Sequence, residues 1–126
     1  MSSPFFDLSG KVAIVTGTSR GIGQYFGRAL ARAGADLVIT SRNKQSLQDF
    51  QKEINQIGRE AFPVELDVNE YESIQNMVAE VENHYRKVDI LVNNAGCNVR
   101  KPAVDITWND WNLVLNTNLR GTFFVA

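Results

Sequence analysis

Short, mainly apolar runs alternate along this chain with longer segments in which apolar residues recur every three or four positions. The short runs have the length and composition of buried strands, and the longer segments have the period of amphipathic helices. The predicted strands are residues 12–15, 36–40, 61–66 and 89–92. The predicted helical segments are residues 24–33, 46–57, 69–85 and 107–122. Strands that alternate with helices favour a parallel sheet built from βαβ units.

Residues at the ends of these segments support the boundaries. Gly34 stands where a glycine commonly ends a helix. Asn69 with Glu72, and Thr107 with Asp110, have the spacing of a capping box. The third and fourth helical segments are therefore predicted to begin at these residues.

Pro63 lies inside the third predicted strand and bears on the strand order. Because proline has no N–H to donate to a ladder, its strand is predicted to lie at an edge of the sheet. The order 3-2-1-4 places the third strand at such an edge. We therefore expect one α/β domain over residues 1–126, with a doubly wound parallel sheet of this order and helices on both faces.

Three glycines separate the first predicted strand from the first predicted helix. Gly17, Gly21 and Gly23 have the spacing Gly-x3-Gly-x-Gly, one step different from the usual dinucleotide fingerprint. Glycine permits a positive φ and a close approach of the backbone to a ligand, and the first turn of a helix offers free N–H groups to an anion. The turn predicts a pyrophosphate site in a Rossmann-type fold; a tight turn without a ligand is the alternative.

Two motifs together, Thr16-Gly-x-x-x-Gly-Ile-Gly23 and Asn93-Asn-Ala-Gly96, resemble the classical short-chain dehydrogenase/reductase family. The resemblance extends from about Leu8 to the last residue. It implies a nicotinamide dinucleotide as cofactor. It assigns cofactor contacts to Gly17, Ser19, Arg20, Gly21, Ile22, Gly23, Asp67, Val68, Asn94, Ala95 and Gly96.

The end of the second predicted strand bears on the choice of cofactor. NAD-specific proteins of this build carry an acidic residue there, whereas this chain has Thr40-Ser41-Arg42-Asn43, and Asp36 lies at the opposite end of the strand. A guanidinium can pair with a 2′-phosphate, and a hydroxyl can add a hydrogen bond. Arg42 and Ser41, with Arg20 in the glycine turn, therefore predict NADP(H). The alternative for each arginine is a solvated surface charge.

The resemblance also gives roles to two segments that follow predicted strands. Asp67 is expected to accept a hydrogen bond from the adenine amino group; a turn aspartate leading into a helix is the alternative. The segment 93–96 is expected to pass beside the adenine ribose and to brace the sheet.

Asn118 is the candidate catalytic residue. In a regular helix it lies about 20° from Trp111 on an apolar stripe, and a buried asparagine needs hydrogen-bond partners. In the family, the asparagine of Asn-Leu-x-Gly, here residues 118–121, belongs to the catalytic tetrad and holds a proton-relay water. The alternative is a structural role in kinking the helix.

The resemblance implies three further catalytic residues: a serine, a tyrosine and a lysine four positions after that tyrosine. None of Tyr25, Tyr71 and Tyr85 is followed four positions later by lysine. The chain also ends on an apolar helical run that has no stop signal. We therefore expect the N-terminal half of a longer dehydrogenase, which stops before a fifth strand and is inactive alone.

The loop after the fourth predicted strand bears on the substrate. Arg100-Lys101-Pro102, with Trp108-x-x-Trp111 after it, looks like the gluconate 5-dehydrogenase and sugar-acid branch of the family. The expected substrate is a small polyol, keto-sugar or sugar acid, and Arg100 is the candidate for binding its carboxylate. A solvated pair of cations is the alternative reading of this loop.

Composition limits the other function classes. A net charge of −1 offers no basic field for nucleic acid, and no apolar run is long enough for a membrane span. Residues 1–7 show no secretory signal, which predicts a cytoplasmic protein. The single cysteine, Cys97, excludes an internal disulfide and a cysteine-based metal cage, and no metal is expected. His84 is expected to be exposed near a helix C-terminus.

We expect the parent protein to be a homo-oligomer. A non-catalytic nucleotide-binding or interaction module is the alternative to an oxidoreductase.

Overall fold

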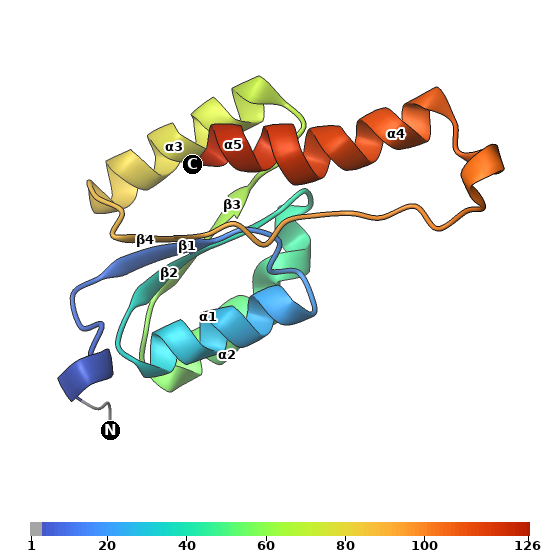
Figure 1. Cartoon of the computed structure of the whole chain (residues 1–126). Coiled ribbons are helices and arrows are strands. Elements are labelled where there is room, and N and C mark those ends of the chain that lie inside the picture. The colour runs from blue at the N-terminus through green and yellow to red at the C-terminus, as the bar shows by residue number, and fades with distance from the viewer. Residues whose placement is uncertain (1–3) are drawn as a thin grey trace.

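Four parallel strands form the sheet in a computed structural model that describes residues 4–126 (Figure 1). Their order, β3-β2-β1-β4, is the predicted one, and β3 with Pro63 lies at an edge. Residues 1–3, which begin the stretch searched for a secretory signal, lie outside the described residues. The strands are β1 (Val12–Val15), β2 (Asp36–Ser41), β3 (Ala61–Glu65) and β4 (Ile90–Val92).

Helices cover both faces of the sheet, as the sequence predicts (Figure 1). One face carries α1 (Ile22–Arg32) and α2 (Gln48–Ile57). The other face carries α3 (Tyr71–Tyr85) and α5 (Thr122–Val125). α4 (Trp108–Leu115) precedes α5 and is joined to it by a π-helical segment, Asn116–Gly121. We call this segment the π-turn. Short 3-10 helices lie at Pro4–Phe6, Lys44–Leu47 and Ala103–Asp105.

The core is divided by the sheet into two clusters. Successive strand residues point to opposite faces, so Val12 and Ile14 pack towards α3 while Ala13 packs towards α1 and α2. Because both faces are covered, the middle residues of the strands are apolar on both faces rather than alternating. On the second face, a Cβ at Gly27 of α1 would lie only 2.8 Å from the Phe50 ring of α2, so glycine allows these helices to approach closely.

The helix ends match the predictions in two cases and differ in one. Gly34 has a φ of +112° after α1, and Thr107 with Asp110 forms both hydrogen bonds of a capping box at α4. The capping box predicted for Asn69 and Glu72 is wrong, because no side chain caps α3. The Asn69 amide instead bonds to a residue of the π-turn, a long-range contact that a local pattern does not contain.

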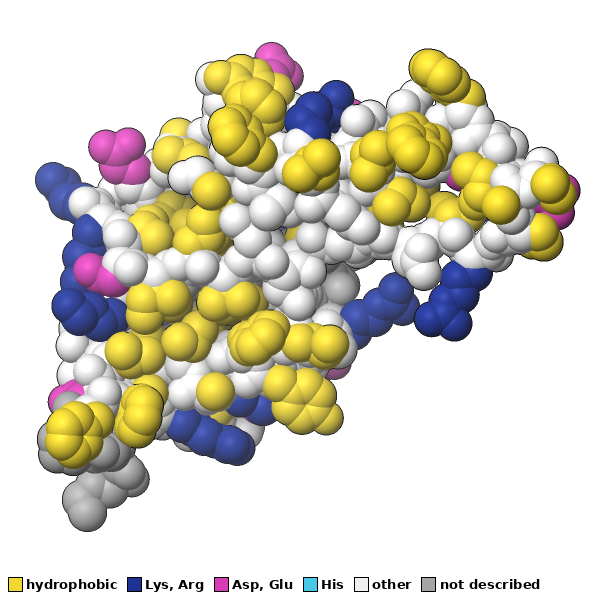
Figure 2. Space-filling model, viewed as in Figure 1, with side chains coloured by type: hydrophobic (Ala, Val, Ile, Leu, Met, Phe, Trp, Pro, Cys, Tyr) yellow, Lys and Arg dark blue, Asp and Glu magenta, His cyan; other side chains and the backbone are white. Residues whose placement is uncertain are grey.

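The last predicted helix is not regular, and its apolar stripe does not face the core. Figure 1 shows that the loop after β4 and α4 project beyond the sheet. We call residues 97–115 the arm. Trp111 of the arm is 61% exposed and Trp108 is 82% exposed. Figure 2 shows apolar side chains on the surface over α4 and α5. The apolar period of this segment therefore predicted burial that the described chain does not provide.

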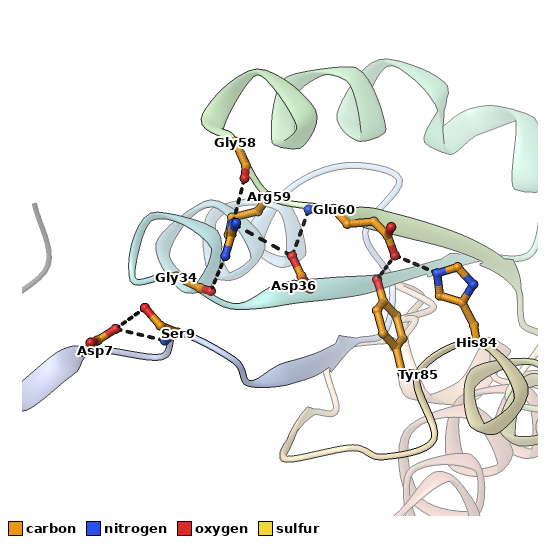
Figure 3. A network of polar contacts seen from close by, with 9 residues as sticks. All are labelled: Asp7, Ser9, Gly34, Asp36, Gly58, Arg59, Glu60, His84 and Tyr85. Atoms are coloured by element: carbon orange, nitrogen blue, oxygen red, sulfur yellow. Dashed lines mark hydrogen bonds and ion pairs between the residues drawn. The ribbon is translucent and has the colours of Figure 1, made fainter.

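A polar network at the amino ends of the strands attaches the end of α3 to the start of β3 (Figure 3). Glu60 accepts a hydrogen bond from the Tyr85 hydroxyl, and its Oε1 lies 2.6 Å from His84 Nε2. The His84 ring stacks on Phe62 with 4.0 Å between centroids. His84 is thus near a helix C-terminus, as expected, but its partners are a carboxylate and an aromatic ring.

Replacing Glu60 with glutamine is expected to flatten the acid dependence of stability. Hydrogen bonds from Tyr85 and then His84 hold the pKa of the Glu60 carboxyl below its usual range. The stability from this ionised group is therefore present above the usual glutamate pKa and is lost as the pH falls through the lowered one. Urea unfolding from about pH 5 to pH 3, across the usual carboxyl range, should show a steeper loss for the wild type than for Glu60→Gln.

Glu65→Gln, at the other end of β3, is the matched control, because Glu65 is exposed and its side chain makes no hydrogen bond within residues 4–126. It should follow the wild type. Parallel curves for the wild type and Glu60→Gln would contradict this account of the network.

Candidate functional site

The turn between β1 and α1 has the geometry of an anion site. Gly17 and Gly21 adopt φ values of +70° and +69°, which glycine allows at low cost. Gly21 is the N-cap of α1, and neither a capping side chain nor an acidic residue lies in the first turn. α4, by contrast, is capped by Thr107. No described side chain caps the N–H groups of Ile22 and Gly23, which are therefore available to an anion, whereas the Gln24 N–H donates to the Gly21 carbonyl oxygen at 3.1 Å.

Gly23 has a different role from the other two glycines. A Cβ at this position would lie 2.4 Å from the Gly17 carbonyl oxygen and 2.7 Å from Asn94 Nδ2. Both distances are too short for a side chain. Gly23 thus lets the start of α1 pack directly against the turn and against the segment that follows β4.

Thr16, at the end of β1, joins the glycine turn to the segment after β4. Its buried hydroxyl accepts hydrogen bonds from the backbone N–H groups of Asn94 and Ala95, both at 2.9 Å. The Asn94 amide in return donates to the carbonyl oxygens of Thr16 at 3.2 Å and Gly17 at 3.1 Å. The Asn94 side chain is therefore a brace in this structure. Sequence reasoning gave Thr16 no such role, although a hydroxyl ending an apolar strand was a visible signal.

A second pair of threonines joins the turn to β2. Thr18 Oγ1 donates to the Thr40 carbonyl oxygen at 3.2 Å and accepts from the Thr40 N–H at 3.0 Å. Both residues are buried. This pair was not predicted from the sequence either. The glycine turn is thus attached to both neighbouring strands.

The predicted 2′-phosphate residues lie on the surface. Arg20 and Arg42 are exposed, and no carboxylate pairs with either among the described residues. Ser41 Oγ bonds to the Asn43 backbone and lies 2.8 Å from Ser46 Oγ, so this hydroxyl shapes the turn after β2. Asp36 is at the far end of β2, as predicted.

Other predicted cofactor residues also follow the carboxyl ends of the strands. Ser19 is exposed in the turn, and Ile22 is 66% exposed at the start of α1. Asp67 follows β3, and its Oδ1 accepts a hydrogen bond from the Asn69 N–H at 3.0 Å. Val68 is buried in the core. The pattern of apolar residues did not reveal that Val68 also contacts the π-turn.

Asn118 lies in the π-turn and binds the backbone of the loop after β4. Its Oδ1 accepts from the Cys97 N–H, and its Nδ2 donates to the Cys97 carbonyl oxygen, both at 2.8 Å. The prediction that Asn118 is buried beside Trp111 is wrong, because the residue is exposed and the π-turn departs from 3.6 residues per turn. The expected hydrogen-bond partners are present. The π-turn at this position favours the helix-disrupting role without removing the catalytic one.

The arm contains the candidate substrate residue and a cavity. Lys101 Nζ lies 2.8 Å from Asp110 Oδ2, and this contact together with the Thr107 N–H lowers the pKa of Asp110. Arg100 is exposed and has no acidic partner in the described chain. Between the arm loop and α4 lies a largely apolar cavity of about 440 Å³, which the sequence analysis did not predict. Its lining includes Val99, Ala103, Ile106, Trp111, Val114 and Leu115.

Residues 4–126 contain neither a cluster of metal-ligating side chains nor a membrane-spanning helix. No group of three or more histidine, cysteine, aspartate or glutamate side chains is placed to hold a metal ion. Within the same residues, every helix is too short or too polar to cross a bilayer.

A parallel sheet of order 3-2-1-4, covered on both faces and carrying a glycine turn at the start of its first helix, defines a Rossmann-type protein. Residues 11–126 match the short chain dehydrogenase family. The chain belongs to this family, whose members are oxidoreductases that bind NAD(H) or NADP(H).

Two similar sequences and one similar structure illustrate the relationship. Gluconate 5-dehydrogenase of Gluconobacter oxydans is 40% identical over 100% of this chain and 50% of its own length. The 2-dehydro-3-deoxy-D-gluconate 5-dehydrogenase of Bacillus subtilis is 43% identical over 96% of this chain and 47% of its own length. The structure of the NADP active-site complex of Pseudomonas aeruginosa RhlG has a TM-score of 0.92 at 28% identity. The match covers 98% of this chain and 48% of the RhlG chain. The chain thus spans about half the length of the curated relatives it matches.

Proposed function

We propose that this chain is the cofactor-binding half of an NADP(H)-dependent oxidoreductase that interconverts an alcohol and a carbonyl on a small polyol, keto-sugar or sugar acid. The observation that carries the proposal is the uncapped start of α1 behind Gly17 and Gly21, beside a β2 end that presents Arg42. The turn would bind the pyrophosphate through N–H groups. Asp67 and the segment 94–96 would bind the adenosine.

The preference for NADP(H) follows from charge. A carboxylate at the end of β2 would repel a 2′-phosphate, whereas a guanidinium can form two charge-assisted hydrogen bonds with it. Arg42 is exposed there, and Arg20 is exposed in the adjacent glycine turn. Neither forms an ion pair within the described residues, so neither must break one to bind a phosphate. The NADP complex of the RhlG structure supports the same cofactor.

The substrate class is proposed from Arg100 and from the relatives that act on gluconate derivatives. Arg100 is exposed, and its neighbour Lys101 is held by Asp110, so Arg100 is the available cation of the pair. It would bind the carboxylate of a sugar acid. The nicotinamide, when bound, supplies or accepts a hydride. Asn118 would hold a water for proton transfer while it anchors Cys97.

The proposal includes a cytoplasmic homo-oligomer. Exposed apolar side chains on α4, the π-turn and α5 support association with another surface, since large apolar patches on a protein surface commonly mark contact sites. They include Trp108, Trp111, Leu119 and Phe123.

The cofactor proposal predicts that the chain binds NADPH more tightly than NADH and that Arg42→Asp removes the difference. Loss of a charge-assisted pair costs about 1.5–3 kcal/mol, or roughly 10- to 100-fold in affinity. The measurement is the dissociation constant of each cofactor by calorimetry. Lys52→Glu, on exposed α2 surface, makes the same change in charge and should keep the preference. An unchanged ratio in Arg42→Asp would exclude Arg42 from the 2′-phosphate site.

The substrate proposal predicts a selective effect of Arg100→Ala in a dehydrogenase that contains this chain. KM for a sugar acid should rise by roughly 10-fold or more, because the cation is lost from a charge-assisted contact of about 1.5–3 kcal/mol. KM for a neutral polyol should change little. Lys101→Ala is the matched control. Equal effects of Arg100→Ala on both substrates would show that Arg100 is only a surface charge.

The 126 residues alone should not turn over any substrate. The alkoxide needs a proton partner with a suitable pKa, which typically contributes 10²- to 10⁴-fold. Burial and the contact with Glu60 raise the pKa of Tyr85. Tyr85 and His84 both bind Glu60 at the amino ends of the strands, away from the glycine turn, so neither is placed to be this proton partner. The assay follows NADPH absorbance with keto-sugar acids after folding has been confirmed. Turnover near the enzyme median of about 10 s⁻¹ would contradict the proposal.

A further inference from the structure

The π-turn holds two separate loops through two consecutive side chains. Thr117 Oγ1 accepts a hydrogen bond of 2.8 Å from Asn69 Nδ2, in the loop between β3 and α3. Asn118 binds both backbone groups of Cys97, in the loop after β4. Neighbours in the π-turn can therefore contact two different loops at once.

Asn69 is bonded at three points. Besides its amide contact with Thr117, its N–H donates to Asp67 Oδ1 at 3.0 Å, and its carbonyl oxygen accepts from Arg120 Nη2 at 3.3 Å. Asp67 is the proposed adenine contact. One residue thus connects that carboxylate to two residues of the π-turn.

The packing of the π-turn on this loop is close. A Cβ at Gly121 would lie 2.7 Å from the Val68 carbonyl oxygen and 2.9 Å from its Cβ. Asn69 Oδ1 is enclosed and has no hydrogen-bond partner in the described chain. An apolar side chain would fill the same space without leaving a buried oxygen unpaired. The amide of Asn69 is therefore better explained by the bond that it makes to Thr117 than by packing.

We infer that Thr117 is a positioning residue for cofactor binding. Together with Asn118 it fixes the spacing between the β3–α3 loop, which carries Asp67, and the loop after β4, which carries the segment 94–96. These two loops would lie on either side of the adenosine, so this inference rests on the proposed function. The chemical class of the ligand is an adenine nucleotide, and Thr117 acts on it only through the two loops.

The test uses adenosine 2′,5′-bisphosphate, which carries the adenine and the 2′-phosphate but no nicotinamide. Thr117→Val keeps the shape of the side chain and removes the hydroxyl acceptor. It should weaken binding to the chain by about 3- to 10-fold, the range expected for one neutral hydrogen bond. Thr117→Ser keeps the hydroxyl and should bind within about twofold of the wild type.

Thr122→Val is the matched control. Thr122 begins α5, and its hydroxyl makes no hydrogen bond within residues 4–126. Affinity should not change. Circular dichroism verifies that each variant is folded, and Thr117→Ser keeps the inference testable if Thr117→Val does not fold.

Amide hydrogen exchange provides a second readout that needs no ligand. The N–H groups of Asn69 and Cys97 both donate to side-chain oxygens of this network. Faster exchange at both amides in Thr117→Val, with rescue in Thr117→Ser, is the expected result. Acceleration at neither amide, or at Asn69 alone, would overturn the inference, because the two loops would then not move together.

The outcomes separate the inference from the proposed function. Wild-type affinity in Thr117→Val overturns the inference and leaves the proposed function intact. A wild-type chain that binds neither the bisphosphate nor NADPH overturns the proposed function and, with it, Thr117 as a positioning residue for a cofactor.

Discussion

The site depends most on the hydrogen bonds that attach the glycine turn to the strands on either side of it. Glycine gives the turn its positive φ angles but loses more backbone entropy on folding than any other residue. The Thr16 hydroxyl offsets part of this entropy loss by accepting hydrogen bonds from the N–H groups of Asn94 and Ala95. Each of these hydrogen bonds contributes about 0.5–1.5 kcal/mol. Thr18 does the same towards β2. Without these contacts an uncapped helix start would have no fixed direction in which to present its N–H groups.

Much of the fold was predictable because it depends on local patterns. Apolar runs, helical spacing and Pro63 gave the strands, the helices and the edge, and Thr107 correctly marked the start of α4. The failures are residues whose partners are distant in sequence. Asn69 has the spacing of a cap but bonds to Thr117, 48 positions away. Trp111 has a helical period, but α4 projects beyond the sheet that would cover it.

The sequence indicated where the candidate residues lie better than how their side chains are arranged. The positions of Gly17, Gly21 and Arg42 follow from where a strand, a turn and a helix meet, so the sequence located them. Thr16 was overlooked because a threonine at a strand end is common and only the structure reveals which N–H groups it accepts. Asn118 was placed on a buried stripe because a period of 3.6 was assumed through the π-turn.

We propose that an NADP(H) site lies along the carboxyl ends of the parallel strands. Titration of the isotope-labelled chain with NADP⁺, followed by backbone amide chemical shifts, tests it most directly. We predict that the shift changes cluster at residues 16–23, 41–42, 67–69 and 94–96, with little change around Glu60. Changes confined to the arm or to the network around Glu60, or no saturable change at all, would contradict it.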